Sequence, residues 1–324
     1  MNKKFSRIFS ALLLATLILS ACSGAGSSSS STNPPLKVAW TLWPGWYPII
    51  IAQEQGFFAK HNVSVEAIRY DNYAAVYPDM ASQKIDGAVS GLYDLLVPAS
   101  QTPLKVVMIT DNSDGAEGLI ATVDIQSPAD LEGKRIGVSP NSIGEFFAVN
   151  LLRQNGLTSA DVTFTNIDAE SVPAQIPSEI EAGYTWEPHL SQAMGNNNHI
   201  LASTADTPGL VPDVVVFQAR VVEQRPEDIR NFVAAWFEAV SWWQEHEAEG
   251  NAIIAKATDQ NAADISTIGV KIFDQADNLT AFTQGTDTTS LFYTGQVQLN
   301  YLISINAFNK TPDLNTLLDP SYLK

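Results

Sequence analysis

Apolar and polar positions follow two different periods in the first part of the chain. A short apolar run at 36–39 predicts a buried strand, and the alternating run 63–68 predicts a second strand. Between them, apolar residues recur at helical spacing from Ile49 to Phe57, and Gly56 suits the left-handed turn that ends a helix. The order strand, loop, helix, strand predicts a βαβ unit.

The loop of this unit is rich in aromatic residues. Trp43, Trp46 and Tyr47 follow the first predicted strand, around a turn at Pro44 and Gly45. In open α/β sheets, ligands bind at the carboxyl ends of the strands. We therefore interpret the three aromatic residues as a wall of a ligand site, with packing over the local core as the alternative for each.

The same patterns continue through the chain and predict an α/β fold. The further strands are expected at 85–91, 104–110, 118–123, 134–138, 162–167, 183–186, 200–202 and 213–218. The longer helices are expected at 142–155, 229–243, 251–258, 262–275 and 288–306. We find no internal repeat.

Two segments carry further candidate ligand contacts. Tyr93 and Asp94 follow a predicted strand, although Asp94 could instead cap the next helix. Asn141, Ser142 and Glu145 stand at the start of a helix, whose free N–H groups and positive dipole end suit a sulfonate, nitrate or carboxylate. A capped helix start without any ligand explains the second segment equally well.

Three motifs carry a resemblance to a known family. They are Trp-Pro-Gly at 43–45 with Ala-x-Glu-x-Gly-Phe-Phe at 52–58, Asp-Leu-x-Gly-Lys-x-Ile-Gly-Val at 130–138, and Trp-Glu-Pro at 186–188. Together they resemble the ABC importer solute-binding proteins for nitrate, taurine, aliphatic sulfonates and the thiamine pyrimidine. The resemblance implies a type II periplasmic-binding-protein fold with two α/β lobes, two crossover strands and a ligand in the interlobe cleft.

The resemblance also implies domain boundaries and further site residues. The first lobe would comprise 36–122 and 218–324, and the second lobe 123–217. A segment like 111–118 precedes the first crossing in the family, which adds Asp111 and Ser113 to the candidates. Trp186 would stack on or edge a ligand, and Glu187 would accept a hydrogen bond from it.

The first residues have the order basic, apolar, small that is typical of a secretory signal peptide. We expect the signal to comprise residues 1–21. Leu-x-Ala-Cys at 19–22 resembles a bacterial lipobox, which implies a lipid on Cys22. Residues 22–35 are rich in Ser and Pro and predict a flexible tether. The expected location is extracytoplasmic, with the membrane reached only through this lipid anchor.

Charge and residue content exclude several functional classes. The chain has 18 basic and 35 acidic residues, a net charge of −17, which becomes 15 − 35 = −20 without the three basic residues of the signal. Such a surface repels nucleic acid. The four histidines show no metal-ligand spacing, and Cys22 is the only cysteine. We therefore expect no metal, no cofactor and no enzyme, since the related thiamine-pyrimidine synthases carry a cysteine-rich motif that is missing here.

These observations predict a monomeric binding protein that passes a small-molecule ligand to an ABC permease and its ATPase. The family favours a nitrate-, sulfonate- or taurine-like ligand. The crowding of Trp43, Trp46, Tyr47, Tyr93 and Trp186 favours an aromatic ring instead, such as the thiamine pyrimidine or a flavin-type ring. A binding subunit that serves a sensor is a third possibility.

Overall fold

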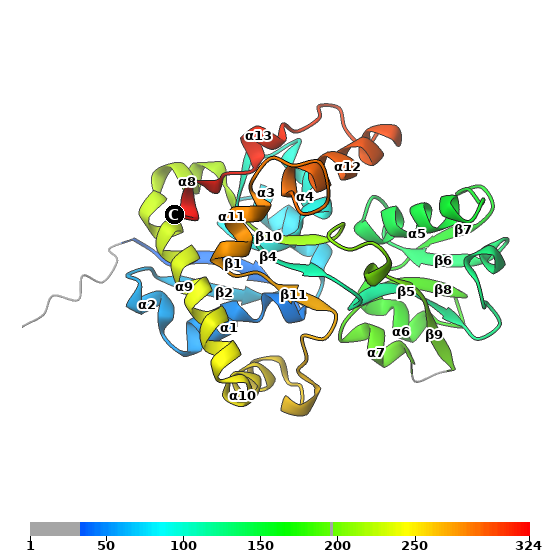
Figure 1. Ribbon diagram of the computed structural model, residues 1–324, viewed down its shortest axis with the longest axis horizontal. Coiled ribbons are helices and arrows are strands. Elements are labelled where there is room, and N and C mark those ends of the chain that lie inside the picture. Colours follow the sequence, from blue (N-terminus) through cyan, green and yellow to red (C-terminus); the bar gives the residue numbers. More distant parts are fainter. Residues whose placement is uncertain (1–32, 195–196) are drawn as a thin grey trace, which may run out of the picture.

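The computed structural model describes residues 33–194 and 197–324 as two lobes, each built on one β-sheet (Figure 1). The first sheet has the strand order β11-β4-β10-β3-β1-β2, and the second β7-β6-β8-β5-β9. The strands of the first sheet are β1 (Leu36–Trp40), β2 (Val65–Arg69), β3 (Gly87–Gly91), β4 (Leu104–Ser113), β10 (Pro212–Gln218) and β11 (Val270–Ile272). Those of the second sheet are β5 (Glu117–Thr122), β6 (Arg135–Val138), β7 (Thr163–Asn166), β8 (Ala182–Trp186) and β9 (Asn198–Ser203).

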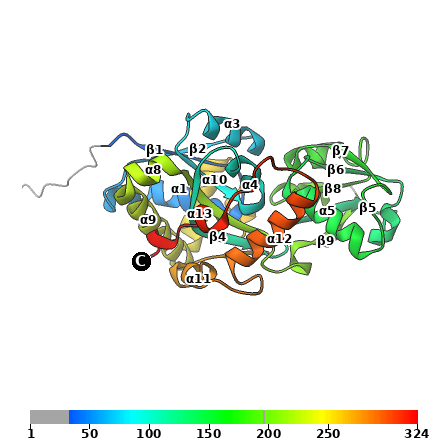
Figure 2. The same ribbon diagram turned by 90° about the horizontal axis from the view of Figure 1, so that it is seen from above.

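Most helices cover the first sheet (Figure 1, Figure 2). Around it lie α1 (Pro48–Glu54), α2 (Phe57–Lys60), α3 (Val76–Ala81), α4 (Leu92–Ala99), α8 (Ala219–Gln224), α9 (Pro226–Glu245), α10 (Glu247–Thr258), α11 (Gln275–Ala281), α12 (Leu291–Ser304) and α13 (Leu314–Leu317). Around the second sheet lie α5 (Ile143–Gln154), α6 (Val172–Gln175) and α7 (His189–Ala193). The two-lobed α/β architecture expected from the sequence is therefore present.

The βαβ unit predicted at the start of the chain is confirmed. β1 and β2 pair in parallel from Leu36 opposite Val65 to Trp40 opposite Arg69. Gly56 has a φ of 73° and separates α1 from α2, as its left-handed preference predicted. The apolar stripe of α9 is likewise a core element, and Trp236 at its centre is completely buried.

Strand direction places particular residues at the cleft between the lobes. β1, β3 and β4 run in one direction, whereas β10 runs antiparallel to β3 and β4. β5 runs antiparallel to β8 in the same way. The starts of β10 and β5 therefore lie at the same edge as the carboxyl ends of their neighbours.

Strand pairing moves the expected lobe boundaries. The strands expected to cross near 118–123 and 213–218 are β5 and β10, and each pairs within a single sheet. The chain passes between the sheets in the links 114–116 and 204–211. We accordingly propose that the lobes change there, with β5 in the second lobe.

The helix expected at 262–275 is wrong. The structure has a 3-10 turn at Ala262–Asp264, then β11, and α11 begins only at Gln275. Gly269 has a φ of 77°, and Asp274 caps α11 by accepting a hydrogen bond from the Asp277 N–H at 2.8 Å. β11 pairs with the end of β4, so tertiary pairing outweighed the helical spacing of the segment.

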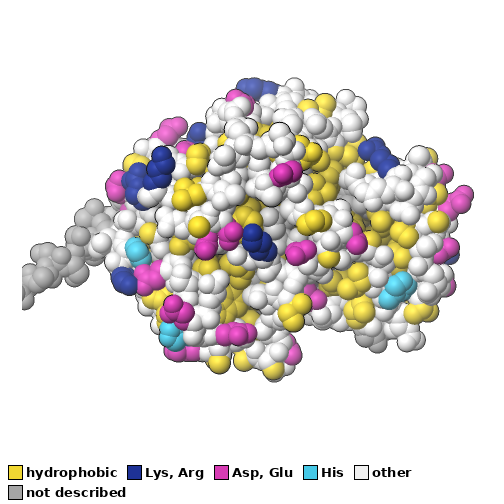
Figure 3. All heavy atoms as spheres, viewed as in Figure 1, with side chains coloured by type: hydrophobic (Ala, Val, Ile, Leu, Met, Phe, Trp, Pro, Cys, Tyr) yellow, Lys and Arg dark blue, Asp and Glu magenta, His cyan; other side chains and the backbone are white. Residues whose placement is uncertain are grey.

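The surface carries the acidity that the composition indicated. On the face shown in Figure 3, Asp and Glu side chains are spread over both lobes. No helix within 33–194 and 197–324 is long and apolar enough to cross a membrane. The predicted signal peptide, Cys22 and most of the tether lie outside the described residues.

Candidate functional site

A cavity lies where the edges of the two sheets face each other. It is lined by residues of both lobes and encloses about 420 Å³, including space that opens to solvent. Its lining consists of Thr41, Trp43, Trp46, Tyr73, Gly91, Leu92, Tyr93, Asp94, Glu117, Ile143, Trp186, Val211, Pro212, Asp213 and Gln298. A cavity between two lobes, mostly apolar with a few convergent polar groups, has the usual form of a small-molecule site.

The two tryptophans of the β1–α1 loop are fixed by carboxylates of the first sheet. The Trp43 indole N–H donates to Asp111 at 2.9 Å, and the Trp46 indole N–H donates to Asp213 at 3.0 Å. Gly45 between them is required by close approach, because a Cβ there would lie 2.1 Å from the Asp111 carboxyl group. The Trp-Pro-Gly-Trp sequence thus holds two ring systems rigidly at the cavity.

Tyr73 and Trp186 bring the aromatic wall of the cavity across to the second lobe. The Tyr73 ring lies 5.7 Å from Trp46 and meets Trp186 edge-on at 5.9 Å, measured between ring centroids. The Tyr73 backbone N–H also donates to Glu170 of the second lobe at 3.2 Å. The lobes therefore touch directly on this side of the cavity.

A cluster of hydroxyl groups supports Tyr73 from behind. The Tyr77 hydroxyl donates to the Tyr73 hydroxyl at 2.6 Å, and both lie 3.0 Å from the Ser90 hydroxyl. The Tyr73 hydroxyl accepts from the Gly91 N–H at 2.9 Å and donates to Asp94 at 3.4 Å. These bonds fix Asp94 and the Tyr73 ring at the cavity together.

Four carboxyl groups gather at this edge, and we call them the carboxylate cluster: Asp94, Asp111, Glu117 and Asp213. Burial raises the pKa of Asp94 to about 6 and the pKa values of Asp111 and Glu117 to about 7. Burial, together with the negative charges of Asp111 and Glu117, raises the pKa of Asp213 well above its ordinary value. Among the cavity-lining residues there is no Lys, Arg or His to offset this charge.

Several donors at the start of α5 already have partners in the protein itself. Asp94 accepts from the Ile143 N–H at 2.9 Å, so it caps α5 across the cleft and does not cap its own helix, where Gly91 is the N-cap. Ser142 accepts from the Glu145 N–H at 3.3 Å, and the Glu145 carboxylate accepts from the Asn141 N–H at 2.6 Å. The donors that we expected to hold an anion therefore have partners within the chain.

The predicted site residues divide into those that line the cavity and those that do not. Trp43, Trp46, Tyr93, Asp94 and Trp186 line it. Asn141 and Ser142 line an adjoining pocket, Tyr47 and Glu187 line a different one, and Asp111 and Ser113 are buried in the first sheet. Glu145 lines none of these.

Tyr47 and Glu187 have structural partners that explain their positions. The Tyr47 hydroxyl accepts from Gln260 at 3.3 Å, and its ring packs on Trp243. The Glu187 carboxylate accepts from the Ser191 hydroxyl at 2.8 Å. These contacts give both side chains a structural role, and neither side chain lines the main cavity.

Several lining residues were not proposed from the sequence as ligand contacts, and among them Glu117, Asp213 and Gln298 bring carboxyl or amide groups to the cavity. The first two stand at the starts of antiparallel strands, whereas the sequence argument considered only strand carboxyl ends. A carboxylate at the head of a buried apolar run, as in Pro212–Phe217, was the available signal. Gln298 lies on α12, and no local pattern marks it.

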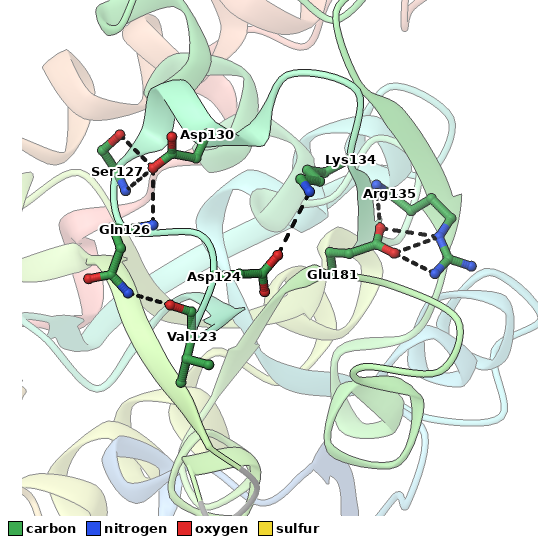
Figure 4. A network of polar contacts seen from close by, with 8 residues as sticks. All are labelled: Val123, Asp124, Gln126, Ser127, Asp130, Lys134, Arg135 and Glu181. Carbon is green, nitrogen blue, oxygen red and sulfur yellow. Dashed lines mark hydrogen bonds and ion pairs between the residues drawn. The ribbon is translucent and has the colours of Figure 1, made fainter.

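The most recognisable motif of the sequence, at 130–138, lies away from the cavity and has a structural role (Figure 4). Asp130 accepts from the Ser127 N–H at 2.8 Å in a capping box. Arg135 pairs with Glu181, which ties β6 to the start of β8. Figure 4 shows these contacts together, with Lys134 directed toward Asp124.

The described residues, 33–194 and 197–324, contain no group of three or more His, Cys, Asp or Glu side chains arranged to hold a metal ion.

Comparisons with known proteins show the family to which the chain belongs. A family model described as NMT1/THI5 like matches residues 43–250. A putative aliphatic sulfonates-binding protein of Bacillus subtilis is 22% identical over 97% of this chain and 95% of its own length. A 4-amino-5-hydroxymethyl-2-methylpyrimidine phosphate synthase of Uromyces fabae is 31% identical, over 46% of this chain and 44% of its own.

Among solved structures, the alkanesulfonate-binding protein of Xanthomonas axonopodis pv. citri, bound to MOPS, superposes with a TM-score of 0.73. The superposition covers 89% of this chain and 99% of that chain, at 12% sequence identity. The fold is therefore that of periplasmic binding proteins, as the resemblance in the sequence implied.

Proposed function

The chain belongs to the NMT1/THI5-like family, and from this premise we propose that it is an extracytoplasmic solute-binding protein. It captures a small organic molecule between its lobes and delivers it to the permease and ATPase of an ABC importer. The observation that carries the proposal is the cavity itself, which takes Trp43 and Trp46 from one lobe and Trp186 from the other. A lipid on Cys22 would keep the protein at the membrane surface.

Binding is coupled to closure in this proposal. The contacts between the lobes include polar pairs, such as the Tyr73 backbone N–H donating to Glu170 at 3.2 Å, and aromatic pairs, such as Phe146 with Tyr301 at 5.0 Å between ring centroids. A ligand that touches both lobes adds contacts that exist only when they are closed, so its binding favours closure. Hinge closure around a ligand is an established mode of domain motion.

The aromatic wall favours a ligand with a flat ring over a small anion. Trp43, Trp46 and Trp186 offer ring faces and edges, and stacked aromatic pairs contribute about 0.5–1.5 kcal/mol beyond burial. A nitrate- or sulfonate-like ligand remains the second candidate, because one similar protein is described as binding aliphatic sulfonates. It has less support from the geometry, since the donors at the start of α5 are occupied.

A binding role is favoured over catalysis. No residue of the cavity pairs a nucleophile with a base, and the sole cysteine, Cys22, is assigned to the lipid. The synthase from Uromyces fabae matches less than half of this chain, so its activity is not extended to it.

The test is native mass spectrometry of the protein purified from its own host, followed by small-angle scattering with and without the solute that it carries. We expect a co-purified small molecule and a smaller radius of gyration in its presence. A saturating solute that leaves the radius unchanged would contradict the closure mechanism. A host locus without permease and ATPase genes would favour the sensor role instead.

A further inference from the structure

The cavity offers hydrogen-bond acceptors far more than donors. Asp94, Glu117 and Asp213 line it, and each of them only accepts hydrogen bonds when it is ionised. Of the three tryptophans that line it, Trp43 and Trp46 already direct their indole N–H groups at Asp111 and Asp213. A ligand that donates hydrogen bonds therefore finds more partners at this site than one that only accepts.

Two further buried groups point to such a ligand. The Tyr93 hydroxyl and the Gln298 side-chain oxygen line the cavity and have no hydrogen-bond partner among the described residues. Tyr93 is 1% exposed and Gln298 is completely buried. Gln298 donates its amide N–H to the Leu210 carbonyl at 2.9 Å, which leaves its oxygen free to accept from a ligand. Buried polar atoms are rarely left unsatisfied in proteins, so these two atoms mark positions where a ligand bonds.

The electrostatics of the cavity select the sign of the ligand charge. An anion would lie beside Asp94, Glu117 and Asp213 without any basic side chain in the lining to compensate. Aromatic faces attract cations and repel anions for the same quadrupolar reason, and the cavity is walled by such faces. A cation gains both from the carboxylates and from the rings.

We propose that the ligand carries a proton-bearing cationic nitrogen, an ammonium or amidinium group, attached to a flat apolar part. The nitrogen donates to Glu117 and Asp213, and the flat part lies among Trp43, Trp46 and Trp186. This inference rests on the proposed function and defines the substrate class of that site. In this proposal the ligand is recognised by Glu117 and Asp213 at the starts of β5 and β10, and not by the N–H groups at the start of α5.

Proton uptake and release follow from the same arrangement. Glu117 is faced by Tyr184, Ser113, Asp94 and Asp111. Asp213 is faced by Asp111, Glu117, Asp94 and Trp46. The phenols of Tyr73, Tyr77 and Tyr93 around Asp94 stay neutral, because burial raises their pKa values. A cation that enters this cluster favours the ionised carboxylates, so its binding releases protons and strengthens as the pH rises through about 7.

The experiment compares three probes that share a benzyl group and carry a cationic, a neutral or an anionic head group: benzylammonium, benzyl alcohol and phenylmethanesulfonate. We expect benzylammonium at millimolar concentration to raise the Tm, with the alcohol weaker by at least about tenfold in Kd and the sulfonate without effect. Calorimetry in two buffers of different ionisation enthalpy should detect the released protons. Stabilisation by the sulfonate, or by the alcohol equally, would overturn the inference, as would the failure of all three probes.

Variants locate the charge that the probe contacts. Glu117→Gln and Asp213→Asn keep the shape of the side chain and should each weaken benzylammonium by about tenfold or more, while leaving benzyl alcohol unchanged. Ser142→Ala is the matched control outside the cavity and should leave both affinities unchanged. Should Asp213→Asn not fold, Glu117→Gln and the probe series on the unmodified protein still decide.

Failure of this inference can be told apart from failure of the proposed function. A co-purified anion that closes the lobes would support a solute-binding protein and overturn the cationic ligand. A co-purified cation that binds without closure would support the cationic ligand and contradict the proposed closure mechanism.

Discussion

Two regions at the cleft differ in their charge: the sheet edge that carries the carboxylate cluster, here called the strand edge, and the start of α5. At the strand edge, burial and repulsion raise the pKa values of the carboxylate cluster, and no basic side chain lines the cavity beside it. At the start of α5, the N–H groups of Asn141, Ile143 and Glu145 all have oxygen partners from the chain. The first region gathers acidic groups without a basic partner, whereas these donors of the second region are occupied.

This difference shows what identifies a binding site within a fold. A helix N-terminus attracts anions only while its donors are free. Asp94 of α4 accepts a hydrogen bond from the Ile143 N–H at the start of α5. The helix N-terminus, although a common anion-binding feature, therefore has fewer free donors for a ligand. Incomplete satisfaction of buried groups is the more informative signal.

The largest expected effect concerns the pH dependence of the strand edge. The pKa of Glu117 is about 7 in the folded protein against an ordinary 4.5, so the folded state binds this proton more tightly than the unfolded state. Its contribution to the free energy of unfolding is complete below about pH 4.5 and is lost as the pH rises through about 7. Glu117→Gln should remove this loss, which amounts to about 3–4 kcal/mol at most.

The measurement is chemical denaturation of unliganded protein and variant between acidic and slightly alkaline pH. Gln keeps an oxygen that can accept from the Tyr184 hydroxyl, so the hydrogen bond to Glu117 is conserved in kind. Glu187→Gln, which removes a half-buried carboxylate outside the main cavity, is the matched control. Parallel pH profiles for Glu117→Gln and the unmodified protein would show that ionisation of Glu117 does not lower the free energy of unfolding.

An intermediate effect is expected where the two regions meet, at Asp94. Asp94→Ala removes the acceptor of the Ile143 N–H and should cost about 1–2 kcal/mol of stability. The freed helix start should then gain measurable affinity for sulfate, detected as a rise in Tm that the unmodified protein lacks. Asp94→Asn, which keeps an acceptor oxygen, should show neither effect. Sulfate binding by the unmodified protein would contradict the prediction, because it would show that the start of α5 still has free donors for an anion.

The smallest effect is expected at the helix cap itself. Ser142→Ala removes the acceptor of the Glu145 N–H and should lower the free energy of unfolding by about 0.5–1 kcal/mol. Because Ser142 does not line the main cavity, solute affinity should not change. Calorimetry of the co-purified solute checks this, and a tenfold loss of affinity would return the helix start to the binding site.

Local patterns were sufficient for the parts of this fold that depend on neighbouring residues. The unit from β1 to β2, the turn at Gly56 and the core stripe of α9 follow from periodicity and backbone preference. The aromatic lining at Trp43 and Trp46 follows from the rule that ligands bind at strand carboxyl ends.

The rest depends on pairing between distant segments. Glu117 and Asp213 face the cavity because β5 and β10 run antiparallel to their neighbours, a direction that no local pattern in either strand reveals. β11 replaced part of an expected helix for a similar reason, since it completes the edge of the first sheet beside β4. Gln298 comes from α12, whose place over the cavity is set only by the assembled core.

Both ends of the described chain are held by the same helix of the first lobe. Asn33 donates to Asp228 of α9 at 2.8 Å, and Tyr322 packs its ring beneath Arg230 of α9, 5.6 Å from the guanidinium carbon. Both ends therefore lie on the lobe opposite α5–α7 (Figure 1). For an engineer, a surface linkage at either end would immobilise one lobe and leave the other free to swing. A fluorophore on the second lobe, far from the attachment point, would then convert ligand capture into an optical signal on a chip.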